Sequence, residues 1–362
     1  MNSVYFSKTF SKDTVIKLAE KSGINSLISK NDFVAIKVHF GEKGNKGYIN
    51  PEYLKPIVEI VKSLGGKPFL TDANTIYKGS RSNAVDHLNI AIEHGFGNCG
   101  CPIIIADGLR GNSYIEVDVG LKHFKTVKIA RDIYYADKFI FLTHFKGHEI
   151  SGFGGAIKNI GMGCGCRHGK YEMHNAIKPN INSEKCIGCG ACIKWCPSNA
   201  LTLLEMSHRD TVSLTGLKLS NKKIIIDKNI CVGCGECILS CEQYAIKIPW
   251  DESTRNAQEK IVEYAAGVLY DKKAIYLNFL NYITKFCDCY ETKEVPLVED
   301  IGIVASDDPV AIDHASAELV NKKFGGDFFK HIFPDIDWSV QLEYAEKLGL
   351  GEKKYNLIES QL

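Results

Sequence analysis

The chain has 362 residues, of which 45% are hydrophobic, and its 44 Lys and Arg against 43 Asp and Glu give a net charge of +1. This composition is enough for a sizeable core, and the balanced charge gives no reason to expect a nucleic acid or an acidic membrane surface as a partner. The first ten residues lack the apolar core of a signal peptide and the longest apolar runs are strand-sized, so we expect a cytoplasmic protein without a membrane span.

Strands and helices alternate along the first 160 residues. The β-branched run Val34–Phe40 predicts a strand, and Pro51–Leu64 predicts a helix because its apolar residues recur at helical spacing before Gly65. A strand, a helix and a strand follow at 68–71, 84–96 and 102–106, and further strands at 127–129 and 138–143. This alternation predicts an α/β domain with a mostly parallel sheet and flanking helices.

Residues 180–250 interrupt this alternation with two Cys-rich stretches around a polar segment, in which a hairpin is expected at Ser220-Asn221. The alternation then resumes with helices at 257–269, 308–323 and 340–348 and strands at 273–279 and 301–305. We therefore predict one discontinuous α/β domain, residues 1–179 and 251–362, interrupted by a small α+β ferredoxin-like module at 180–250. Three domains in a row are the alternative.

The Cys-rich region contains the same four-Cys motif twice, within a chain that has 14 Cys. Clustered thiols in a reducing compartment favour metal over disulfides, and this spacing is that of bacterial two-cluster ferredoxins, in which the fourth Cys ligates the other cluster. Zinc knuckles are the alternative, and Glu242 stands where Pro usually follows the fourth Cys. The sequence predicts two 4Fe-4S clusters, one held by Cys186, Cys189, Cys192 and Cys241 and the other by Cys231, Cys234, Cys237 and Cys196.

The six other cysteines form three Cys-x-Cys pairs, one of which is Cys99/Cys101. The other two flank the module and together offer four thiolates to a third metal centre, either zinc or iron–sulfur. His168 and His174 are alternative ligands, and the opposing hypothesis is that these cysteines are reduced and structural. The predicted third site thus consists of Cys164, Cys166, Cys287 and Cys289.

A glycine-rich segment at 143–159 follows a predicted strand and opens a predicted helix, which favours an anionic or small-molecule substrate pocket over a simple packing corner. Asp72–Arg81 and the Asp307-Asp308 pair follow other strands and are expected to line the same cleft, although Asp308 also fits an ordinary helix cap. The catalytic candidates are the acid–base residues His144, His148 and His39, with Lys146 and Lys158 supplying positive charge.

These segments resemble the iron–sulfur proteins grouped as the domain of unknown function 362 family. The resemblance implies a frequent two-cluster ferredoxin insert and brings no established reaction. The α/β part is also loosely similar to the nickel-dependent lactate racemase superfamily. The matching segments are Lys37–Gly41, Asp72–Arg81, Asp86–Leu88, His144–Gly163, Phe286–Cys289 and Asp300–Asp313.

Three functional hypotheses follow. The first is an iron–sulfur oxidoreductase, of the kind used in anaerobic metabolism, which takes electrons from a redox partner protein and relays them through the two clusters to a cleft in its own α/β domain. The module's charge of +2, unlike that of acidic free carriers, favours such a tethered relay. The second is a non-enzymatic electron carrier or partner subunit, and the third is an iron–sulfur or metal-handling protein.

Overall fold

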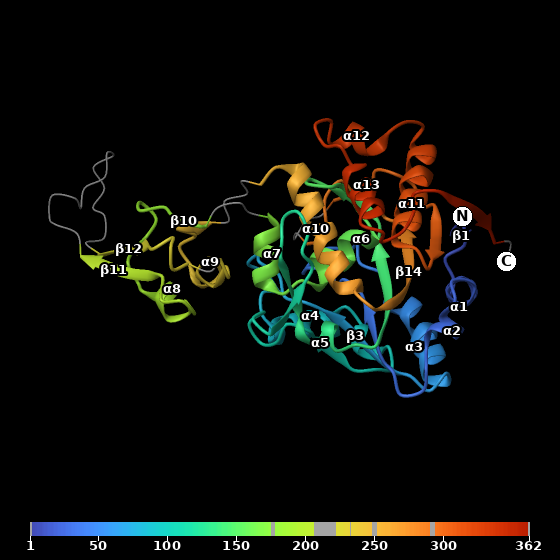
Figure 1. The fold of residues 1–362 in the computed structure, drawn as a ribbon, viewed down its shortest axis with the longest axis horizontal. Helices are drawn as coiled ribbons and strands as arrows, with labels where there is room; N and C mark the ends of the chain where they lie inside the picture. The colour runs from blue at the N-terminus through green and yellow to red at the C-terminus, as the bar shows by residue number, and fades with distance from the viewer. Residues whose placement is uncertain are drawn as a thin grey trace.

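The computed structural model describes residues 2–174, 178–205, 222–231, 233–247, 252–289 and 294–360. Its centre is an eight-stranded sheet in the order β16-β1-β15-β14-β7-β2-β3-β4 (Figure 1). Strand β15 runs antiparallel to its neighbours β1 and β14, and the other neighbouring pairs are parallel. The strands are β1 (Asn2–Ser7), β2 (Phe33–Lys37), β3 (Lys67–Asp72), β4 (Ile103–Ile105), β7 (Lys138–His144), β14 (Lys273–Leu280), β15 (Gly302–Ser306) and β16 (Tyr355–Glu359).

Helices cover both faces of the sheet because its central strands alternate apolar side chains between two cores. Along β7, Phe139 and Phe141 belong to one core, whereas Ile140 and Leu142 belong to the other. These layers confirm the predicted α/β fold class with a mostly parallel sheet. The first core contains residues of α5 (Arg131–Tyr134), α6 (Ala156–Cys164), α7 (Arg167–His174), α10 (Thr254–Leu269), α11 (Pro309–Phe324), α12 (Phe328–Ile332) and α13 (Val340–Lys347), and the second contains residues of α1 (Lys12–Lys21), α2 (Ile24–Leu27), α3 (Leu54–Ser63) and α4 (Ala84–Glu93).

Most of the expected elements occur within a few residues of their predicted bounds, with three differences. The expected helix at 51–64 begins as a 3-10 turn at Pro51–Tyr53 before α3. The strand expected at 127–129 is β6 (Thr126–Ala130), which pairs with β5 (Tyr114–Asp118) in a hairpin outside the main sheet. Strands β1 and β16 and helix α1 were not predicted; each strand has only three or fewer consecutive apolar residues between polar ones.

The described parts of residues 180–247 contribute small strand pairs and two short helices beside α7, at the left of Figure 1. The strands of the eight-stranded sheet that precede and follow this region, β7 and β14, are parallel neighbours, with Leu142 opposite Leu277. The first strand of the expected Ser220-Asn221 hairpin lies outside the described residues. The module's elements are β10 (Asn180–Ile181), α8 (Ala191–Lys194), β11 (Leu201–Glu205), β12 (Lys222–Ile226), α9 (Glu236–Ser240) and β13 (Ile246–Lys247), with β10 paired to β13 and β11 to β12.

Two further features bear on the site. A short hairpin, β8 (Lys146–His148) and β9 (Gly152–Gly154), follows β7 directly. Helix α6 then packs closely on α10, since a Cβ at Gly161 would lie 2.0 Å from the carbonyl oxygen of Ile261. In the part of the chain that is described, no helix is both long and apolar enough to cross a bilayer.

Candidate functional site

Two cavities in the module are each lined by four cysteines, and in each the fourth Cys of one motif lies with the first three of the other. Their volumes are nearly equal, about 320 and 310 Å³. A cubane cluster needs four thiolates distributed around a space, because each iron takes one sulfur. The residues present therefore fit two such clusters. The first cavity is lined by Cys186, Cys189, Cys192 and Cys241, and the second by Cys196, Cys231, Cys234 and Cys237.

The backbone around these cysteines repeats in the two halves of the module. The peptide N–H of Ala200 donates to Cys196 Sγ at 3.2 Å, and that of Ala245 donates to Cys241 Sγ at 3.3 Å. Such bonds stabilise thiolates and tune the potential of a cluster. Glu242 therefore leaves the backbone contact of its neighbouring Cys equivalent to that beside Pro197. The two glycines of each motif share a left-handed backbone, with φ between 67° and 76° at Gly188, Gly190, Gly233 and Gly235.

The module contacts the α/β body through buried charge and aromatic packing. Arg167 on α7 is 1% exposed and its Nη1 donates to Glu236 Oε1 at 2.6 Å. The ring of Tyr171, one helical turn later, lies 3.4 Å from where a Cβ would stand on Gly233. The second cysteine-lined cavity is thus held against the body.

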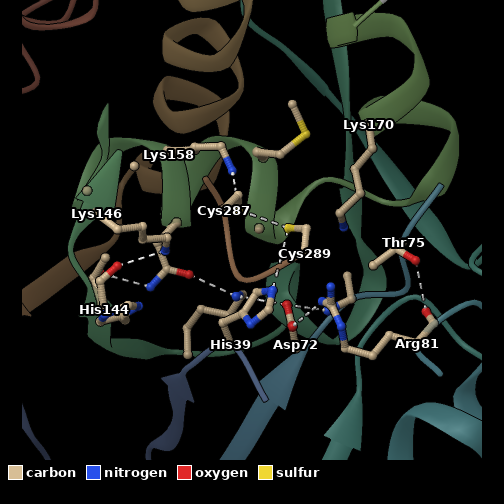
Figure 2. Close-up of a pocket in the computed structure, with 18 of the residues that line it drawn as sticks. His39, Asp72, Thr75, Arg81, His144, Lys146, Lys158, Lys170, Cys287 and Cys289 are labelled. Carbon is tan, nitrogen blue, oxygen red and sulfur yellow. Dashed lines mark hydrogen bonds and ion pairs between the residues drawn. The ribbon is translucent and has the colours of Figure 1, made fainter. Parts of the chain in front are cut away.

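A central cavity of about 690 Å³ lies at the carboxyl ends of the parallel strands (Figure 2). Lys37 ends β2, Asp72 ends β3 and His144 ends β7, and all three line it. Cys287 and Cys289, which follow β14, complete the wall. Ligands bind at this edge in α/β proteins because loops from neighbouring parallel strands converge there. The sequence predicts a cleft at this edge, lined by His39, the 72–81 segment and the 143–159 segment.

Positive side chains dominate this cavity. Asp72 accepts from Lys37 at 2.9 Å and lies 3.7 Å from Arg81 Nη1. Lys158 and Lys170 also line the wall, and among the described residues neither forms an ion pair with a carboxylate. Burial lowers the pKa of Lys170. Because buried cations that lack a carboxylate partner are costly, the cavity is suited to an anion.

The remaining wall cation, Lys146, is committed to a buried network. Its Nζ lies 2.9 Å from Asp288 Oδ2, and His144 Nδ1 also lies 2.9 Å from the same oxygen. Burial opposes the charge on Asp288, but His144 and Lys146 outweigh it and lower the pKa of the carboxyl group. Asp288 stands between Cys287 and Cys289 in the chain, so this network fixes the loop that carries both thiols.

The two thiols are unequal. Their Sγ atoms are 3.1 Å apart, with Cys287 donating to Cys289. This hydrogen bond lowers the pKa of Cys289 and raises that of Cys287; burial opposes the first shift, and Lys158 and Arg81 add to it. Lys158 Nζ lies 3.7 Å from Cys287 Sγ. Burial alone would lower the pKa of Lys158, but the thiol groups raise it.

The three histidine candidates differ in what they can do. His144 is engaged at both nitrogens, since Nε2 also contacts the carbonyl oxygen of Asn281 at 2.8 Å, so it acts as a structural clamp. His39 Nδ1 accepts from the N–H of Gly41, which leaves the Nε2 proton facing Cys289 Sγ at 3.6 Å. Burial and then Arg81 lower the pKa of His39 to about 3, so it is neutral. His148 does not line the cavity, and its Nδ1 accepts from the N–H groups of Ile150 and Ser151 instead.

The glycine-rich segment does not present a free helix N-terminus. Asp313 accepts from the N–H of Ala156 at 2.6 Å and from that of Ile157 at 2.9 Å. A Cβ on Gly155 would collide with this carboxylate. The anion at the start of α6 is therefore the protein's own, and the segment serves the cavity through its lysine side chains instead.

The four cysteines of the expected third metal site do not line one cavity. Cys287 and Cys289 line the central cavity, whereas Cys164 contacts the carbonyl oxygen of Asn159 within α6 and Cys166 accepts from Gly169. In the described residues, no three Cys, His, Asp or Glu side chains gather closely enough for a single metal ion. The other candidates also have local roles: Cys99 contacts the Pro51 carbonyl, His168 pairs with Glu172, and Asp308 caps α11.

Three functional positions were missed from the sequence. Asp288 was not predicted, although a carboxylate inside a Cys-x-Cys pair is itself a signal. Lys170 and Arg167, in the segment that follows Cys166, were not predicted either, although both are positively charged.

His174 also lines the cavity, and burial followed by Lys158 lowers its pKa to about 3. In the unfolded chain, His174 takes up a proton near pH 6.5, whereas the buried side chain stays neutral. The free energy of unfolding should therefore fall as the pH drops below that value and recover above it. Between pH 7.5 and 5.5 we expect His174→Gln to lose about 1 kcal/mol less stability than the unsubstituted protein. Denaturant unfolding at both pH values checks this, and equal losses would contradict the assignment.

The chain matches the family described as Domain of unknown function (DUF362) over residues 34–318. It is 37% identical over 41 residues to the ferredoxin-type protein NapF of Haemophilus influenzae, a match that spans 11% of this chain and 23% of that protein.

Among solved structures, the lactate racemase apoprotein from Thermoanaerobacterium thermosaccharolyticum is 16% identical with a TM-score of 0.35, covering 64% of this chain and 56% of that one. A protein from Thermotoga maritima is 11% identical with a TM-score of 0.37, covering 87% and 58%. The family match extends over most of the chain, residues 34–318, and the protein therefore belongs to the Domain of unknown function (DUF362) family.

Proposed function

We propose that this protein is an iron–sulfur oxidoreductase that carries electrons through two 4Fe-4S clusters to a small anionic substrate in its central cavity. Residues 180–250 would be the inserted cluster-binding module, and residues 1–179 and 251–362 the discontinuous α/β domain that holds the substrate. A redox partner protein would supply the electrons.

The observation that carries this proposal is a shared wall. Ile76 and Tyr77 line the central cavity, and the same two residues pack in the apolar cluster that contains cysteines of both predicted sets. Electrons leaving the module would therefore have to cross little more than this loop. The cysteines in that apolar cluster are Cys186, Cys192, Cys196, Cys237 and Cys241.

The two cysteine-lined cavities also differ in their surroundings: one is near solvent and the other lies against the α/β body, as an electron relay would require. Cys189, in the first set, is exposed, and the neighbouring Ile187 is 52% exposed. The second set lies against Tyr171 of the α/β body. The first cluster would thus accept electrons from a docking partner, and the second would lie on the side of the substrate.

The cluster assignment is tested by anaerobic purification with iron and sulfide quantitation and EPR of the reduced protein. Two cubanes require about eight iron and eight sulfide per chain, with spin-coupled signals. A preparation reconstituted under the same conditions that holds fewer than about four iron would contradict the proposal.

The anion site gives a separate prediction. Phosphate and succinate should each raise the melting temperature of the unsubstituted protein, and Lys158→Gln should weaken this binding about tenfold by removing a charged donor. The control is Lys17→Gln, because Lys17 is exposed on α1 and far from the cavity in sequence and fold. Equal stabilisation of all three proteins by both anions would show that they bind elsewhere.

A further inference from the structure

The Cys287/Cys289 pair is chemically set apart from the other cysteines of the α/β body. Its sulfurs are 3.1 Å apart, and both line the cavity where the substrate would lie. Cys99, Cys164 and Cys166 contact backbone groups instead. Formation of a disulfide, with its S–S bond of about 2.05 Å, would require an approach of roughly 1 Å.

The surroundings favour redox chemistry of the thiols over metal binding. Lys158 Nζ lies 3.7 Å from Cys287 Sγ, and the Arg81 side chain lines the same cavity as Cys289. Lys37, Lys146 and Lys170 also line the cavity. Five cationic side chains line this poorly solvated space against one lining carboxylate, Asp72, so a divalent cation is disfavoured, whereas a thiolate and an anionic substrate would be stabilised.

We propose that Cys287 and Cys289 form a dithiol–disulfide pair that reduces a small disulfide bearing carboxylates. The two thiols supply the nucleophiles that thiol–disulfide exchange requires, and the surrounding cations bind the carboxylates of the substrate. Regeneration of the dithiol rests on the proposed function, because two one-electron iron–sulfur donors are its source of electrons.

The steps balance. The Cys289 thiolate attacks one substrate sulfur, which forms a mixed disulfide and releases one substrate thiolate. Cys287 gives its proton to that leaving thiolate, attacks Cys289 Sγ and releases the second. Two electrons and one proton then return the protein disulfide to one thiol and one thiolate.

The two cysteines differ in the way these steps require. Cys289 is partly exposed in the cavity and faces the Nε2 proton of His39, whereas Cys287 is 3% exposed behind it. Asp288, held by His144 and Lys146, acts as a positioning residue that keeps both sulfurs on one side of the loop. Cys289 is therefore the attacking thiol and Cys287 the resolving thiol.

The first test counts electrons in the cluster-loaded protein. After mild oxidation with diamide, stoichiometric anaerobic reduction should consume two electrons more per chain in the unsubstituted protein than in Cys287→Ser/Cys289→Ser. Differential alkylation and mass spectrometry should find these two residues linked after oxidation and free after reduction. The matched control, Cys99→Ser/Cys101→Ser, has the same spacing outside the cavity and should consume as many electrons as the unsubstituted protein.

The second test uses chromogenic disulfide exchange. Relative to their rates with a free alkyl thiol, the anionic 5,5′-dithiobis(2-nitrobenzoate) should react with the pair about tenfold faster than the neutral chromogenic reagent 4,4′-dithiodipyridine, and Lys158→Gln should reduce this preference. Equal electron counts in the protein and its double Ser variant, or no preference for the anionic reagent, would overturn the proposal. So would a stoichiometric metal ion that is lost only in Cys287→Ser/Cys289→Ser.

These outcomes separate the two proposals. If iron and sulfide are absent, the electron-transfer function fails, yet alkylation and disulfide exchange still report on the thiol pair. If the clusters are present and reducible but no Cys287–Cys289 disulfide forms, only the thiol proposal fails.

Discussion

Replacing Cys186 and Cys241 together with Ala should leave one of the two clusters in place. These residues stand in different motifs, but they line the same cavity with Cys189 and Cys192. If each motif instead held its own cluster, this double substitution would damage both. We therefore expect the variant to retain about half of the iron and sulfide and to lose the spin coupling between clusters in its EPR spectrum.

The matched control is Cys186→Ala/Cys196→Ala, which takes both residues from one motif. They line different cavities, so this variant should lose most of its iron. Both variants remove two thiols from the same small module, and a general loss of folding would affect them alike. The reverse ranking of iron contents would refute the crossed assignment.

Substituting Arg167 with Met should destabilise the contact between the module and the α/β body by about 3–5 kcal/mol, because it leaves a buried carboxylate without its cation. Arg167 donates to Glu236 Oε1 at 2.6 Å and to the Thr75 carbonyl oxygen at 3.1 Å, and both charged side chains are under 5% exposed. Nη1 also contacts the carbonyl oxygen of Arg110, and Nη2 contacts that of Ser82. Thermal unfolding of the cluster-loaded protein under anaerobic conditions measures the loss.

The double variant Arg167→Met/Glu236→Gln should recover part of that stability, since it removes the unpaired charge. Arg131→Met is the control: Arg131 is exposed and contacts Ser113 and the Tyr114 carbonyl, so its loss should cost under about 0.5 kcal/mol. A loss at Arg167 no larger than at Arg131 would mean that the buried ion pair does not hold the module in place.

The layered fold could be read from the sequence because its signals are local. Apolar spacing along 54–63 and the runs that became β2, β3 and β7 specify their elements without reference to the rest of the chain. The antiparallel insertion of β15 between β1 and β14 could not be read in this way. Strand order depends on which edges meet in space, and a short apolar run is compatible with either direction.

The central cavity was predictable in part. Parallel strands bring their carboxyl ends to one edge, so His39, Lys146 and Lys158 could be expected near each other. Their roles could not be predicted, because these depend on partners distant in sequence. Asp288 converts His144 into a clamp, and Asp313 occupies the helix start that seemed open to a substrate.

The chemical groups of this protein were predictable from residue spacing: thiols at the spacing typical of two cubanes, alternating elements of an α/β sheet, and cations after its strands. Which of these side chains share a cavity became clear from the folded structure. It separates Cys164 and Cys166 from Cys287 and Cys289, and it places Ile76 and Tyr77 between the module and the cavity. The physical reason is that spacing along the chain fixes local geometry, whereas burial and charge pairing depend on residues that folding alone brings into contact.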